Sequence, residues 1–116
     1  MKEFLLLFRG DQPNREAADS PERMQQNMMK WKTWMDEMAS KGKLNGGQPL
    51  TTEGKTINGK SKKVLDGPFA EGKEIVGGYL LIKANDFNDA VELSQACPIF
   101  DDGGSVEIRE IQELMM

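Results

Sequence analysis

The chain has 116 residues, which fits a single domain over residues 1–116, and its 38 % hydrophobic and 29 % charged residues are an ordinary globular mixture. Its net charge of −4 argues against a nucleic-acid partner and against an anionic membrane, because phosphate contacts need a basic surface. The single cysteine, Cys97, excludes an intramolecular disulfide and favours a reducing compartment, so we expect a cytoplasmic protein.

The absence of histidine excludes the commonest catalytic base and the commonest metal ligand. Ser-His-Asp and Cys-His catalysis are therefore ruled out, and structural zinc is not expected with one cysteine. We expect no metal and no cofactor. Any chemistry has to use carboxylates, lysines, arginines, hydroxyls, Tyr79 or Cys97.

The first elements are a strand and a long helix. Residues 4–8 form an apolar run that predicts a central strand buried on both faces, and before Arg9 the run is too short for a signal-peptide core. Residues 10–19 are polar and predict a loop. Ser20, Pro21 and Glu22 are typical of a helix start, and Lys41-Gly42 of a helix end.

The predicted helix carries one apolar stripe at alternating spacings of four and three. Its members are Met24, Met28, Trp31, Met35 and Met38, with Met29 and Trp34 beside them. This periodicity favours core packing against a sheet or a partner, and a ligand-binding surface is the alternative.

The middle of the chain predicts a hairpin. Residues 43–49 are read as a glycine-rich connection, followed by strands at 50–57 and 62–65 around a tight Asn58-Gly59 turn. Its lysines favour a solvated hairpin that resists edge-to-edge pairing, with a phosphate-binding finger as the alternative.

Residues 54–61 also satisfy the P-loop pattern of glycines, lysine and serine. A P-loop has to enter a helix whose first amides hold the phosphates, but residues 62–68 cannot form a useful helix. We therefore interpret this match as chance.

The last third of the chain predicts strand, helix and strand. Residues 74–84 form a strand in which Gly77-Gly78 indicates a bulge or a close backbone approach. Asp86 caps a second helix that Pro98 stops. The final strand includes Val106, Ile108 and Ile111. The order β-α-β-β-β-α-β predicts an α+β, ferredoxin-like fold with an antiparallel sheet and two helices on one face.

Cys97 lies just before Pro98, at the predicted end of the second helix. The negative end of a helix dipole disfavours a thiolate, and no histidine is present to activate the sulfur. We expect a packed, structural thiol.

Residues 66–74 read Asp-Gly-Pro-Phe-Ala-Glu-Gly-Lys-Glu. Physically, the run begins with a turn that Asp66 organises by accepting hydrogen bonds from loop amides, while Phe69 anchors the loop. With Gly-Gly-Tyr at 77–79, Cys97-Pro98 and residues 104–109, it resembles the YCII-related family in its Asp-Gly-Pro-Phe (DGPF) branch. The sequence departs from that pattern at Gly72, where threonine is frequent, and at Glu110, where proline is common.

The resemblance implies a ferredoxin-like domain that pairs into a homodimeric α+β barrel. It implies little about activity, since the family is largely uncharacterised. A His-Asp pair suggested for its better-known branch cannot be carried over, because this chain has no histidine. Some family members occur beside alternative sigma factors, which implies a role in transcriptional regulation.

Three functional hypotheses remain open. The first is a dimeric module that binds a small-molecule ligand or regulates, with a polar cleft beside the helix-free sheet face, lined by Arg9, Asp66, Glu71 and Lys73. The opposing structural interpretation is that Asp66 and Glu71 only organise their loop, and that Arg9 pairs with an acidic neighbour on the sheet.

The second hypothesis is a lyase or isomerase. Asp66 or Glu71 would take a proton, and Arg9 or Lys73 would stabilise the developing negative charge. A carboxylate that works as a base near neutral pH needs burial to raise its pKa. The third hypothesis, an interaction module linked to transcriptional regulation, rests on the family context alone.

Overall fold

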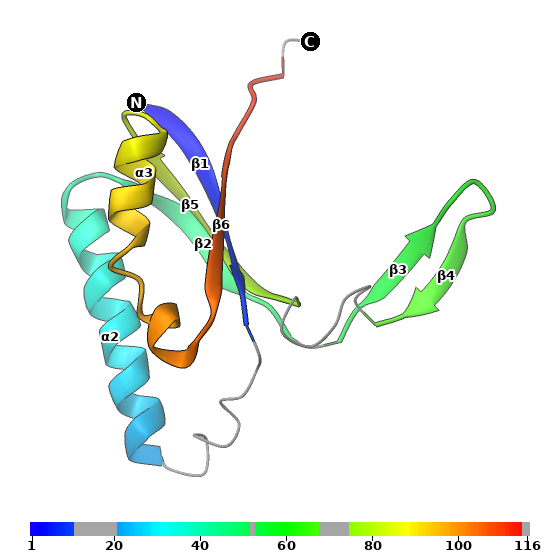
Figure 1. The fold of residues 1–116 in the computed structure, drawn as a ribbon, viewed down its shortest axis with the longest axis horizontal. Coiled ribbons are helices and arrows are strands. Elements are labelled where there is room, and N and C mark those ends of the chain that lie inside the picture. The colour runs from blue at the N-terminus through cyan, green and yellow to red at the C-terminus, as the bar shows by residue number, and fades with distance from the viewer. Residues whose placement is uncertain (11–20, 52, 68–74, 115–116) are drawn as a thin grey trace.

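The computed structural model describes residues 1–10, 21–51, 53–67 and 75–114. Its elements, in chain order, are β1 (Lys2–Arg9), α2 (Pro21–Ser40), β2 (Leu44–Pro49), β3 (Lys55–Asn58), β4 (Lys63–Asp66), β5 (Val76–Ala84), α3 (Phe87–Ser94), the 3-10 helix η2 (Pro98–Asp102) and β6 (Ser105–Glu110) (Figure 1). Strands β2, β5, β1 and β6 form one antiparallel sheet in that order, and β3 and β4 form a separate sheet of two strands.

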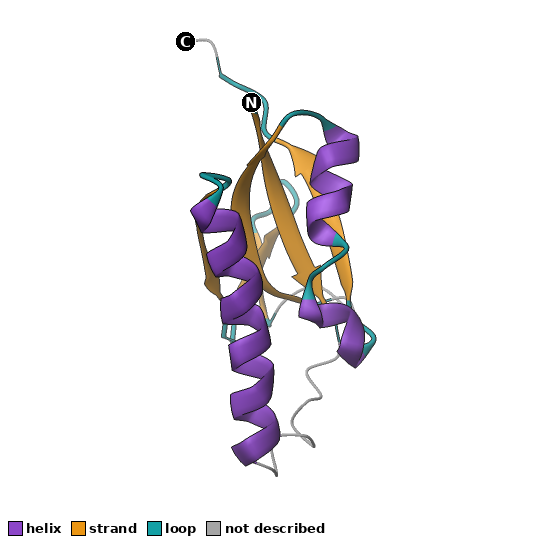
Figure 2. Cartoon of the chain, turned by 90° about the vertical axis from the view of Figure 1, so that its left-hand side faces the viewer, coloured by secondary structure: helices purple, strands orange, loops and turns teal. Residues whose placement is uncertain are grey.

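The four-stranded sheet confirms the predicted α+β, ferredoxin-like class. Strand β1 lies at its centre between β5 and β6, as its apolar sequence predicts. The connection through α2 places β2 beyond β5, and the connection through α3 places β6 beyond β1. Both helices lie on one face of the sheet (Figure 2). No described helix is long and apolar enough to cross a membrane.

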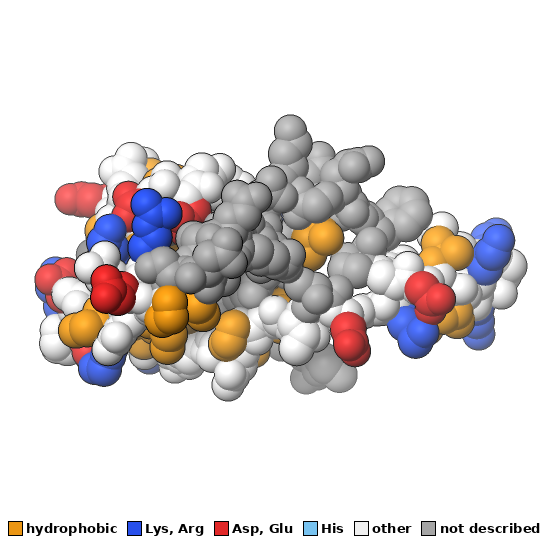
Figure 3. Space-filling model, turned by 90° about the horizontal axis from the view of Figure 1, so that it is seen from below, with side chains coloured by type: hydrophobic (Ala, Val, Ile, Leu, Met, Phe, Trp, Pro, Cys, Tyr) orange, Lys and Arg blue, Asp and Glu red, His pale blue; other side chains and the backbone are white. Residues whose placement is uncertain are grey.

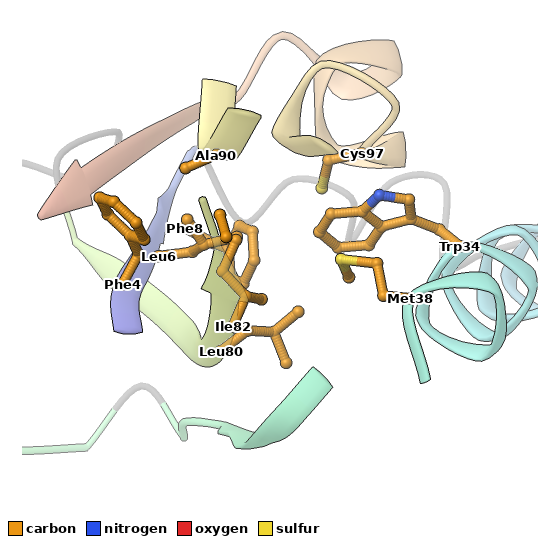
Figure 4. Close-up of a cluster of buried hydrophobic side chains, with 10 residues drawn as sticks. Phe4, Leu6, Phe8, Trp34, Met38, Leu80, Ile82, Ala90 and Cys97 are labelled. Carbon is orange, nitrogen blue, oxygen red and sulfur yellow. The ribbon is translucent and has the colours of Figure 1, made fainter. Parts of the chain in front are cut away.

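The core lies between this face and the helices. Phe4, Leu6 and Phe8 alternate along β1 toward the helices and are buried beside Leu80 and Ile82 of β5. From α2, the side chains of Trp34 and Met38 point into the same cluster (Figure 4). Each such side chain contributes about 1.5–3 kcal/mol by leaving water.

The prediction that β1 is buried on both faces is wrong for the face that points away from the helices. Leu5, Leu7 and Arg9 alternate away from the helices and are only partly buried. We call this side, together with Tyr79 and Leu81 of β5, the open face. Among the described residues, no helix or strand covers it.

Helix α2 begins at Pro21 as predicted, while Ser20, its expected cap, lies outside the described residues. The predicted stripe divides in two. Its C-terminal part packs on the sheet, but Met24 and Met28 are 47 % and 67 % exposed. The reason is geometric, because the N-terminal half of α2 extends past the end of the sheet (Figure 2). After the helix, Gly42 adopts the predicted left-handed conformation, with φ of 70°.

The segment predicted as a glycine-rich connection is the edge strand β2, and a register shift interrupts its pairing with β5 between Leu44 and Gly46. At Gly47 a Cβ atom would lie 2.4 Å from the carbonyl oxygen of Tyr79. Backbone pairing therefore holds most of β2, with Leu44 packing against the core, and hydrophobic periodicity misses a strand of this composition. The strand predicted over 50–57 is correspondingly wrong, because only Lys55–Asn58 forms β3.

The β3–β4 hairpin forms, but its turn is longer than predicted. Asn58 pairs with Lys63, so the loop contains the four residues 59–62 rather than two. Lys62 has φ of 55° and donates its amide to the carbonyl of Gly59 at 3.1 Å. No helix follows residues 54–61 within the described chain, which confirms the rejection of the P-loop.

The C-terminal elements follow the predictions closely. Strand β5 has the predicted bulge at Gly77, because Phe8 of β1 pairs with Gly78 and the next residue, Arg9, pairs with Val76. Asp86 caps α3 by accepting a 2.8 Å hydrogen bond from the amide of Asp89. Helix α3 ends at Ser94, before Pro98, and that proline begins η2. Strand β6 ends at Glu110, one residue short of the predicted Ile111.

Candidate functional site

A cavity of about 750 Å³ lies between the N-terminal half of α2 and the ends of β1, β2 and β5. It is on the helix side of the sheet, and η2 forms its far wall with Ile99 and Asp102. Side chains of Phe8, Trp31 and Met35 line its interior. The cavity exists because α2 continues past the sheet, so its apolar stripe has no strand beneath it there.

Two aromatic rings, Phe8 and Trp31, line this cavity, and a third ring, Trp34, packs against them. The Phe8 ring meets Trp31 edge-on at a centroid distance of 5.1 Å, and Trp31 meets Trp34 at 5.7 Å. The indole nitrogen of Trp34 donates a 3.0 Å hydrogen bond to the carbonyl of Leu93. Edge-to-face pairs of this kind contribute about 0.5–1.5 kcal/mol beyond their burial. The wall is therefore preorganised.

Glycines let the backbone approach closely where the strands end at the cavity. A Cβ atom at Gly104 would lie 2.5 Å from Cγ1 of Ile99 and 2.9 Å from the carbonyl oxygen of Arg9. A Cβ atom at Gly78 would lie 3.2 Å from the carbonyl oxygen of Gln48. Any larger residue at these positions would push the segments apart and change the shape of the cavity.

Polar residues also line the cavity. They are Gln25, Asn27, Lys32, Gln48 and Asp102. Met28, which is 67 % exposed, lies among them, and hydrophobic side chains are visible on this lower side of the molecule (Figure 3). Apolar side chains with a few polar groups among them suit a small, mostly apolar molecule.

Arg9, a predicted ligand-binding residue, lies at the end of β1 on the open face. Its guanidinium forms an ion pair with Glu107 of β6, which confirms the expected acidic neighbour. Arg109 also donates to Glu107, at 3.3 Å. These hydrogen bonds, from Arg109 and then from Arg9, lower the pKa of the Glu107 carboxyl below its ordinary value.

Asp66, the other described candidate, ends β4 in the separate hairpin. Its side chain is 91 % exposed and accepts a 2.6 Å hydrogen bond from Nζ of Lys55, while the amides of residues 68–74, on which its predicted role depends, lie outside the described residues. Glu71 and Lys73 lie outside the described residues. Arg9 and Asp66 thus belong to different sheets, and neither is among the described residues that line the cavity.

Sequence reasoning assigned Trp31 and Met35 to the core stripe and did not single out the cavity. The signal was present in the composition of the stripe, since methionine and tryptophan adapt to irregular spaces and to ligands. What periodicity could not show is where the sheet ends beneath the helix. That depends on strand lengths and on the crossing of α2 over the sheet.

Comparison with known proteins supports the fold. No curated protein matches the sequence. Among solved structures, the chain resembles 5-chloro-2-hydroxyhydroquinone dehydrochlorinase (TftG) from Burkholderia phenoliruptrix, in complex with 2,5-dihydroxybenzoquinone. The TM-score is 0.54 at 17 % identity, covering 95 % of this chain and 93 % of the other. The sequence matches the YCII-related domain over residues 4–115, and the chain belongs to this family.

Proposed function

We propose that this protein is a small homodimeric module that binds a flat, mostly apolar molecule in the cavity beneath α2. The observation that carries the proposal is the cavity itself. Its volume of about 750 Å³ falls within the range of small-molecule sites, and its wall is built from side chains that the fold already holds in place. Binding there needs no rearrangement of the described core.

The side chains that line the cavity favour an aromatic or quinonoid ring. Phe8 and Trp31 offer ring contacts, and Met35 offers a polarisable thioether. Asp102 provides a carboxylate that can accept a hydrogen bond from a hydroxyl on the ring. The similar structure holds 2,5-dihydroxybenzoquinone, a flat ring with polar edges, which agrees with this ligand class.

The homodimer belongs to the proposal because of the open face. Leu7 lies opposite Tyr79 and Leu5 opposite Leu81, so four large side chains meet at the centre of the sheet. A sheet face with such residues is ordinarily covered. A second copy would cover it and leave the cavity, on the helix side, accessible.

Ligand binding is tested by isothermal titration with 2,5-dihydroxybenzoquinone. Met28→Glu places a charge at the mouth of the cavity, and we expect the dissociation constant to rise at least about fivefold, which corresponds to roughly 1 kcal/mol. Met24→Glu is the matched control, because Met24 lies one turn earlier on α2, is also exposed, and does not line the cavity. Equal effects of both variants, or no binding by the parent protein, would contradict the proposal.

A lyase is the second candidate, favoured by the activity named for the similar structure. A carboxylate base near neutral pH needs burial, whereas Asp66 is 91 % exposed in the described chain. Asp102 is the carboxylate that lines the cavity among the described residues; it is exposed as well, so its position at the cavity is what favours it. Chloride release from 5-chloro-2-hydroxyhydroquinone, abolished in Asp102→Asn but retained in Asp101→Asn, would support catalysis, and no release from this compound would count against it.

A further inference from the structure

The β3–β4 hairpin stands apart from the rest of the molecule. It forms its own sheet and contributes no residue to the described core. Its additional hydrogen bonds stay local: the amide of Gly67 donates to the carbonyl of Gly54 at 2.6 Å, and the Thr56 hydroxyl donates to the carbonyl of Gly67 at 3.1 Å. An isolated two-stranded hairpin is marginally stable in water. The hairpin is therefore expected to pack on something outside this subunit.

One side of the hairpin is suited to packing. Ile57 and Val64 are register partners, so they lie next to each other on the same side, and they are 68 % and 55 % exposed. The next register pair on that side is Lys55 and Asp66, which form an ion pair at 2.6 Å, while Lys60 and Lys62 lie in the turn. Figure 3 shows hydrophobic, basic and acidic side chains together at the right-hand end of the molecule. The hairpin thus offers an apolar pair with charged groups of both signs beside it.

The position of the hairpin indicates what it meets. In Figure 1 both helices lie on one side of the sheet and the hairpin projects on the other, so it reaches out from the end of the open face. The view onto the helix side agrees, with α2 and α3 in front of the sheet and the hairpin behind it (Figure 2). The hairpin therefore projects from one end of the open face, on the side away from the helices. A molecule that covers the open face would also contact the hairpin.

The open face carries charges of both signs. Glu107 lies there between Arg9 and Arg109, and Lys83 pairs in register with Glu3. Such a surface can face a copy of itself, because a two-fold axis brings each acid near a base. A nucleic acid would instead need a basic face.

We propose that the β3–β4 hairpin is an arm that embraces a second copy of this chain. Two copies face each other through their open faces, and each arm lays Ile57 and Val64 against the other copy. This inference rests on the homodimer of the proposed function and adds to it the element that holds the dimer. It requires nothing of the cavity.

The first test is sedimentation velocity over a range of concentrations. The double variant Ile57→Asp/Val64→Asp is expected to raise the dissociation constant of the dimer at least about tenfold, because each dimer contains two arms. Val91→Asp is the control, since Val91 is an exposed valine on α3, on the helix side of the sheet. An unchanged dimer in the double variant, an equal loss in the control, or a parent protein that is monomeric at high concentration would overturn the proposal.

Hydrogen exchange on the unmodified protein gives a readout that does not depend on a variant. Amides of residues 55–58 and 63–66 are expected to exchange slowly in the dimer and faster once dilution separates the copies. Exchange rates that do not change with concentration would refute the arm. Titration of 2,5-dihydroxybenzoquinone into the double variant separates this result from the ligand proposal, because loss of the arm should leave the cavity intact.

Discussion

Cys97 shows how burial controls the chemistry of a single residue. The thiol is 3 % exposed and points toward the Trp34 ring (Figure 4). Burial raises the pKa of Cys97 to about 12, and the nearby Asp101 charge adds to this, while a backbone hydrogen bond involving Ile99 opposes it. The prediction of a packed, structural thiol is confirmed. The main cause of the raised pKa of this thiol is burial rather than the helix dipole.

We expect the Cys97 thiol to be almost inert in the folded protein. At about pH 8 its reaction with Ellman's reagent should be at least about 100-fold slower than in urea-unfolded protein, because the thiolate is the reactive form. The measurement is the rate of thionitrobenzoate release. Similar rates in the two states would show that the thiol is accessible in solution.

Glu107 provides a pH-dependent contribution to stability. Because its pKa in the folded protein is lower than its ordinary value of 4.5, folding favours the ionised carboxylate. The unfolded chain therefore binds more protons at acid pH, and this stabilisation is present above that ordinary value and lost as pH falls through the folded value.

We expect Glu107→Gln to lower the unfolding temperature most at about pH 6, and the difference from the parent protein to shrink toward about pH 3. The measurement is thermal unfolding followed by circular dichroism across this range. Glu113→Gln is the control, since Glu113 lies beyond the end of β6. A difference that stays constant with pH would mean that ionisation of Glu107 does not contribute.

At the scale of elements, α2 has two roles. Its C-terminal half closes the core through Trp34 and Met38, and its N-terminal half forms one wall of the cavity through Met28 and Trp31. The indole hydrogen bond from Trp34 to Leu93 joins α2 to α3 across the top of the core. The orientation of α2, and with it the shape of the cavity, depends on this joint.

Trp34→Phe is expected to lower the free energy of unfolding by about 1–3 kcal/mol, because it leaves the Leu93 carbonyl without its donor and a space in the core. Chemical denaturation measures this change. Trp31→Phe makes the same replacement at a residue for which the described chain shows no hydrogen-bond acceptor, so a smaller loss is expected. A larger loss of unfolding free energy in Trp31→Phe would show that the aromatic contacts, rather than the Trp34 hydrogen bond, hold α2 in place.

At the scale of the whole molecule, the two faces of the sheet have separate uses. The helix side holds the core and the cavity, and the other side holds the open face and the hairpin. In the proposed dimer, ligand binding and association therefore use mostly different surfaces, and Tyr79 is a residue that the open face and the cavity lining share. This separation is what allows variants of Met28 and of Ile57 to test the two proposals independently.

The sequence by itself determined the elements whose signal is local. The apolar runs of β1 and β5, the 3.6-residue period of α2 and the Asp86 cap are properties of neighbouring residues, so these elements and the ferredoxin-like class could be predicted. The Asp-Gly-Pro-Phe run, with the rest of the resemblance, pointed to the YCII-related family, to which the chain belongs.

Only the tertiary structure decided the features that depend on distant partners. Strand β2 exists because its glycines fit against the backbone of β5, and Arg9 finds Glu107 from the far end of the sequence. The cavity lies where α2 extends past the end of the sheet, and among the described residues the β3–β4 hairpin pairs with no strand of that sheet. Each of these results from the path of the whole chain in space, which local periodicity does not encode.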